Sequence, residues 1–111
     1  MDIWVFTEKG EDGFYTTTHL TEKGCLLSAV DVLIDVLGVD ADTEEMWEQW
    51  KQTEETWEND TEWAELPCPV GWREMTLKEL WNIFEHYEPL TWDRVDFFDC
   101  GVSKTQVQPR I

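Results

Sequence analysis

Two short runs of β-branched and aromatic residues at the start of the chain predict two strands. Residues 3–7 (IWVFT) and 14–18 (FYTTT) are β-branched and aromatic, which is typical of strands. The intervening residues 8–13 (EKGEDG) contain two glycines and are rich in turn-forming side chains. We therefore expect an N-terminal β-hairpin.

The next segment carries the periodicity of a helix. Thr21 is a suitable N-cap, and Gly38 is a suitable residue to end the helix. Apolar positions cover most of the helix circumference and leave a narrow polar strip, which predicts the central helix of the core. The main apolar line is Leu26, Val30, Leu33 and Leu37, and the polar strip is Ser28, Asp31 and Asp35.

A second, amphipathic helix is expected after Asp42, with Glu45 completing a capping-box pair. We expect it to fray near residues 59–60, with a short extension through Trp63. Its apolar side chains recur within one arc at helical spacing, and glutamates occupy the opposite arc. The apolar positions are Met46, Trp47, Trp50 and Trp57, and the acidic positions are Glu44, Glu48, Glu55, Glu58 and Glu62.

The remaining pattern predicts one more helix and one more strand. Thr76 and Glu79 form a capping-box signature, and Pro89 is expected to end the helix that follows. Val95–Cys100 (VDFFDC) has strand character and is placed beside the hairpin, whereas the polar residues 103–111 are expected to form a flexible tail. The predicted fold class is α+β, a short antiparallel sheet packed against two or three helices in a single domain over residues 1–102.

Candidate catalytic chemistry is sparse. The sequence contains no nucleotide-binding or nucleophile-elbow motif, and His19 and His86 belong to different predicted elements. The odd number of cysteines (Cys25, Cys68 and Cys100) includes no C-x-x-C pair, which argues against a disulfide framework or a zinc site. We therefore expect no cofactor, no metal and no enzymatic activity. An enzyme that uses one of the histidines remains a third, weaker hypothesis.

The net charge limits the class of partner. The 111 residues include 25 Asp and Glu against 8 Lys and Arg, which gives a formal charge of −17. Such a chain repels nucleic acid and anionic membranes, so we expect it to bind neither directly. It attracts a basic partner instead. The first residues lack a basic and apolar signal segment, and this absence, together with the odd cysteine count, predicts a cytoplasmic protein.

The acidic residues concentrate between Asp40 and Glu65. This segment holds 11 acids and one base, Lys51, and so carries −10 of the total charge. If it were helical throughout, it would present one carboxylate per ~3.5 Å, close to the ~3.4 Å per phosphate of a single DNA strand. Two interpretations are open: a solvated face that maintains solubility, or a surface that imitates a phosphate backbone. The second is favoured, because a net charge of about 2–8 is enough for solubility.

Eight tryptophans raise the question of which side chains pack and which bind a partner. Those at helical core spacing, Trp47, Trp50, Trp57 and Trp81, are expected to pack. Trp63, Trp72 and Trp92 lie near predicted breaks and are the candidate contact residues, because tryptophan is a favoured interface anchor.

In size, charge and composition the chain resembles the small acidic DNA-mimic inhibitors of phages and mobile elements, which block restriction enzymes or CRISPR effectors. It also resembles acidic immunity proteins that neutralise cationic nuclease toxins, which is the alternative function. The resemblance to the inhibitors implies a bacterial host and a basic nucleic-acid-binding protein or nuclease complex as partner, and leaves the oligomeric state open. The candidate partner-binding residues are Glu44, Glu48, Glu55, Glu58, Glu62, Trp63 and Glu65.

Overall fold

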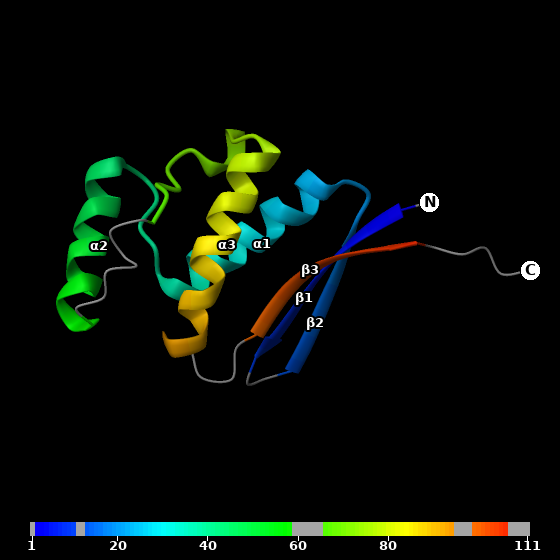
Figure 1. Ribbon diagram of the computed structural model, residues 1–111, viewed down its shortest axis with the longest axis horizontal. Coiled ribbons are helices and arrows are strands. Elements are labelled where there is room, and N and C mark those ends of the chain that lie inside the picture. Colours follow the sequence, from blue (N-terminus) through cyan, green and yellow to red (C-terminus); the bar gives the residue numbers. More distant parts are fainter. Residues whose placement is uncertain (1, 11–12, 59–65, 95–98, 107–111) are drawn as a thin grey trace, which may run out of the picture.

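A three-stranded antiparallel sheet forms one end of the molecule (Figure 1). The computed structural model describes residues 2–10, 13–58, 66–94 and 99–106, with the backbone alone at 53–58, 92–94, 99 and 106. β1 (Asp2–Gly10) lies between β2 (Gly13–His19) and β3 (Asp99–Gln106). The predicted hairpin and the α+β class, with a C-terminal strand beside the hairpin, are therefore confirmed.

The third strand begins and ends later than predicted. It runs over Asp99–Gln106 rather than Val95–Cys100, so residues 103–106 belong to the sheet and not to a tail. Val102 pairs with Phe6 on the side facing the core, whereas Ser103 and Thr105 lie on the other face and are exposed. The polar residues in this segment led to the prediction of a tail, but they are polar because one face of the strand is exposed to solvent. Residues 95–98 and 107–111 lie outside the described part of the chain.

The central helix is α1 (Glu22–Leu37), and both of its predicted ends are confirmed. The Thr21 hydroxyl accepts a hydrogen bond from the Gly24 N–H at 3.0 Å. Gly38 has φ 66°, a left-handed conformation that glycine adopts without strain, and its N–H donates to the Asp35 carbonyl. The side chains that α1 buries are the predicted apolar stripe and its neighbours, Cys25, Leu26, Ala29, Val30 and Leu33.

Helix α3 (Leu77–Arg94) packs across α1, and its start is confirmed. The Thr76 N–H donates to Glu79 Oε1 at 3.1 Å, and the Glu79 N–H donates back to the Thr76 hydroxyl at 3.3 Å. The prediction that Pro89 ends the helix is wrong. Proline removes one N–H donor from the helix, but Leu90 and Thr91 directly after it are buried, and this packing keeps the chain helical.

The acidic helix is α2 (Glu44–Glu58), which lies at the end of the molecule away from the sheet (Figure 1). Its N-cap is Thr43 and not Asp42, because the Thr43 hydroxyl accepts a hydrogen bond from the Met46 N–H at 3.1 Å. The Asp42 N–H donates instead to Asp40 Oδ1 at 3.4 Å. The predicted extension of the helix through Trp63 lies outside the described residues.

Candidate interaction surface

The predicted acidic face begins on α2. Glu44 and Glu48 are exposed there, one helical turn apart. The backbone positions of Glu55 and Glu58 fall on the same side of the helix, within an arc of about 80° that includes Glu44 and Glu48. The other predicted contact residues, Glu62, Trp63 and Glu65, lie outside the described part of the chain.

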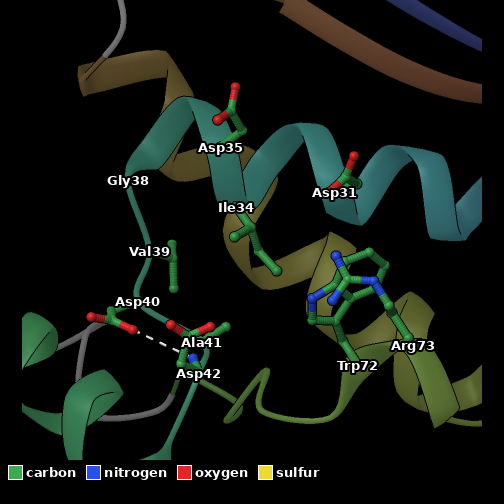
Figure 2. A pocket seen from close by; sticks show the side chains of 10 residues that line it. All are labelled: Asp31, Ile34, Asp35, Gly38, Val39, Asp40, Ala41, Asp42, Trp72 and Arg73. Atoms are coloured by element: carbon green, nitrogen blue, oxygen red, sulfur yellow. Dashed lines mark hydrogen bonds between the residues drawn. The ribbon is translucent and has the colours of Figure 1, made fainter.

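A hollow beside the start of α2 adds carboxylates that the sequence analysis did not assign to the site. It has a volume of about 450 Å³ and is lined by Asp31 and Asp35 of α1 and by Asp40 and Asp42 of the following loop (Figure 2). The sequence indicated only that Asp31 and Asp35 lie on the same face of α1, because they are four residues apart on its polar strip. Asp40 and Asp42 join them in lining this hollow because α1 ends at Gly38, where the chain turns and continues into the loop.

We use the term acidic surface for the described carboxylates of the α2 face and the hollow. Only the α2 face was predicted from the sequence. The members are Asp31, Asp35, Asp40, Asp42, Glu44 and Glu48.

Two basic side chains of this region lie on tryptophan rings, and one of them, Arg73, also lines the hollow. Lys51 Nζ lies 4.6 Å from the centroid of the Trp47 ring, and the Arg73 guanidinium lies 4.3 Å from that of Trp72. Both arrangements are favourable cation–π contacts. Within the described ranges, no lysine or arginine forms an ion pair with a carboxylate of the acidic surface.

The tryptophans mainly support the core. Trp47 is buried, and Trp50 and Trp81 are half-buried against the core, so packing is confirmed for these three. Trp72, predicted as a contact residue, is 6% exposed, and that prediction is wrong. The ring belongs to a single 3-10 turn (Trp72–Glu74) and is covered on one side by Arg73.

The predicted roles of the other three tryptophans concern side chains outside the described part of the structure. Trp57 lies in α2 and Trp92 lies in α3, in the parts of these helices that are described for the backbone only. Trp63, the candidate anchor in the acidic segment, lies outside the described residues.

The two candidate catalytic histidines lie on different elements, β2 and α3. His19 Nε2 lies 3.0 Å from the Thr17 hydroxyl on β2, and His86 Nδ1 lies 2.8 Å from the Asn82 carbonyl on α3. Cys25 is buried, which raises the pKa of its thiol and makes it a poor nucleophile. In the segments that the structure covers, no group of three or more His, Cys, Asp or Glu side chains has the arrangement of a metal site.

Comparisons with known proteins found no relative of this chain. No family model, curated protein or solved structure matches the chain. None of the described helices has both the length and the apolar character needed to cross a membrane.

Proposed function

We propose that the protein is a non-catalytic, cytoplasmic inhibitor that occupies the nucleic-acid-binding surface of a basic protein or nuclease complex. The observation that carries this proposal is the acidic surface itself. Its carboxylates form no ion pair with the described bases, although Lys51 and Arg73 lie nearby on Trp47 and Trp72. A surface selected only for solubility has no need of charges at this density.

The spacing of charge along α2 matches that of a nucleic-acid strand. The 15-residue helix contains six glutamates, and its axis is about 22 Å long. One strand of B-DNA carries about six phosphates over the same distance. A groove lined with lysine and arginine to hold phosphates would meet four of these glutamates on the ~80° arc of the helix, Glu44, Glu48, Glu55 and Glu58.

The scaffold holds these charges in a fixed arrangement. Trp47 inserts into the core from α2, and Gly38 turns the loop so that Asp40 and Asp42 follow the end of α1. A prearranged surface loses less conformational freedom on binding than a flexible acidic tail does. The inhibitor would then exclude DNA or RNA by steric and electrostatic competition, after long-range attraction to the partner.

A cell-based assay tests the proposal and identifies the class of partner. The chain would be expressed in strains that restrict unmodified phage, in strains that target the phage with a CRISPR system, and in strains that carry a nuclease toxin. We expect restored phage plating in at least one of the first two groups. Protection only against a toxin would favour the alternative, an immunity protein, and no effect in any strain would contradict the proposal.

Charge reversals connect the phenotype to the acidic surface. Glu48→Lys should weaken inhibition, and the Glu44→Lys/Glu48→Lys double variant should weaken it further. The matched control is Glu85→Lys, an exposed glutamate of α3 that borders a different hollow, beside Lys78 and Trp81. An equal loss in the control variant, or full activity in the double variant, would show that the acidic surface is not the inhibitory one.

A further inference from the structure

Strand β2 is an unprotected edge of the sheet. It lies at one side of the order β2-β1-β3, and no other described strand pairs with its outer side. Its first six residues are all exposed, and its sequence, GFYTTTH, contains no Asp, Glu, Lys, Arg or Pro. Proteins usually protect such an edge with charged residues, proline or a bulge, because the free N–H and C=O groups can pair with another strand.

Exposed apolar side chains gather at this edge. Among the described residues, four large hydrophobic side chains are exposed, and three of them lie on β2 or directly after it. Phe14 is 65% exposed, Tyr15 59% and Leu20 72%. A neutral and partly apolar strip on a protein with a charge of −17 indicates a contact surface that is distinct from the acidic one.

We propose that β2 pairs antiparallel with β2 of a second copy of this chain, which joins the two sheets into one of six strands. A two-fold axis at Thr16 places Thr16 opposite Thr16 of the second copy, Phe14 opposite Thr18, and Tyr15 opposite Thr17. Threonine pairs and aromatic–threonine pairs of this kind stabilise antiparallel sheets. This interface is isologous, and it closes as a dimer.

Charge selects a second copy over a basic partner at this edge. A basic partner is attracted to the acidic surface, whereas β2 offers it no carboxylate to bind. A second copy carries the same negative charge and is repelled by most of the surface. Because β2 contains no charged residue, the strand itself adds nothing to this repulsion. Because α2 lies at the opposite end of a molecule 58 Å long, the two acidic helices would stay far beyond the ~10 Å range of unscreened repulsion at 0.1 M salt.

The dimer should be weak and dependent on concentration and salt. A seven-residue strand buries less area than the standard interface of a stable complex. Added salt should strengthen the association, since it screens the repulsion between two molecules of charge −17. The dimer would present two acidic surfaces, one at each end, but its formation does not depend on the proposed inhibitory function.

Sedimentation equilibrium of the full chain, from micromolar to near-millimolar concentration, tests the dimer. The wild type should show a reversible monomer–dimer equilibrium. Thr16→Lys and Thr16→Glu should each weaken it by at least roughly tenfold, because like charges face each other across the axis. An equimolar mixture of the two variants should recover the dimer, because Lys then faces Glu. Thr105→Lys, at an exposed threonine on the same face of β3, is the matched control and should leave the equilibrium unchanged.

Two outcomes would overturn the proposal. One is a wild type that remains monomeric at every concentration and salt condition. The other is a dimer that survives both Thr16 variants, or that is lost equally in Thr105→Lys. If the Thr16 variants do not fold, amide exchange in the wild type decides the matter: the outward amides of β2 should become more protected as the concentration rises, and unchanged protection would refute the pairing.

Discussion

Trp47 of the acidic helix donates a hydrogen bond from its indole Nε1 to the Tyr87 hydroxyl of α3 at 3.0 Å. The same hydroxyl donates to the Pro67 carbonyl at 2.7 Å. Both rings are buried, so this pair fixes α2 and the segment around Pro67 against α3. The orientation of the acidic surface therefore depends on a buried polar contact as well as on apolar packing.

Replacing Tyr87 by Phe should reduce the free energy of unfolding by about 1–3 kcal/mol, since it leaves the buried Trp47 N–H without its partner and removes the bond to the half-buried Pro67 carbonyl. Urea denaturation followed by tryptophan fluorescence would measure the change. Tyr15→Phe is the matched control, because Tyr15 is exposed on β2, and it should have little effect. Equal stability of Tyr87→Phe and wild type would mean that this hydroxyl contributes nothing to holding α2.

Tyr87 should also make the fold sensitive to alkali. Burial raises the pKa of its phenol well above its usual range, only partly offset by the hydrogen bond from Trp47. An unfolded tyrosine ionises at about pH 10, whereas folded Tyr87 keeps its proton there. Above that pH the unfolded state therefore binds fewer protons than the folded state. The free energy of unfolding should therefore fall as pH rises above about 10.

The titration is best followed in the Tyr15→Phe background, where Tyr87 is the remaining tyrosine. Tyrosinate absorbance should appear together with the loss of folded circular dichroism. Ionisation of Tyr87 near pH 10 in the intact fold would contradict this expectation.

Glu79 should contribute stability at neutral pH that is lost in acid. Hydrogen bonds from the Thr76 N–H and hydroxyl lower the pKa of its carboxyl below the ordinary value of about 4.3. This contribution is present above the unfolded pKa and disappears as pH falls through the lower folded pKa. Glu79→Gln should thus be less stable than wild type at pH 7, and the two stabilities should converge in acid. A difference that stays constant across this range would contradict the assignment.

Salt should stabilise the folded protein. The self-repulsion of 17 net negative charges opposes the compact state, and screening reduces this repulsion. The melting temperature should therefore rise with sodium chloride concentration. In Glu44→Gln/Glu48→Gln the rise should be smaller, because the variant removes two carboxylates of the acidic surface that form no ion pair with a described base. A melting temperature that does not change with salt would mean that the bases compensate the acids more fully than the contacts indicate.

Local sequence signals predicted much of the fold. The caps of α1 at Thr21 and Gly38 and the Thr76–Glu79 capping box were identified because these motifs act over a few residues. Pro89 was misread, because the buried Leu90 and Thr91 keep α3 helical through contacts made by tertiary packing. Such contacts join residues far apart in the sequence, and a local pattern does not record them.

The candidate site was predicted only in part, for a similar reason. The helical spacing of Glu44 and Glu48 places them on one exposed face, and the structure agrees. The participation of Asp31 and Asp35 depends on the chain turning at Gly38, which sets the loop aspartates beside them. The stacking of Lys51 and Arg73 on tryptophans had no signal in the sequence beyond their proximity to Trp47 and Trp72.

Competitive release by DNA tests the central claim most directly. The immobilised chain would capture proteins from a bacterial lysate at low salt, and short duplex DNA would then be added in place of salt. Duplex DNA is itself repelled by the acidic chain, so it can release a bound protein only by taking the surface which that protein uses for nucleic acid. We expect DNA to release nucleic-acid-binding proteins from the wild type and from Glu85→Lys, and we expect the Glu44→Lys/Glu48→Lys variant to retain little of them. Bound proteins that DNA does not release, or equal capture by the double variant, would contradict the account.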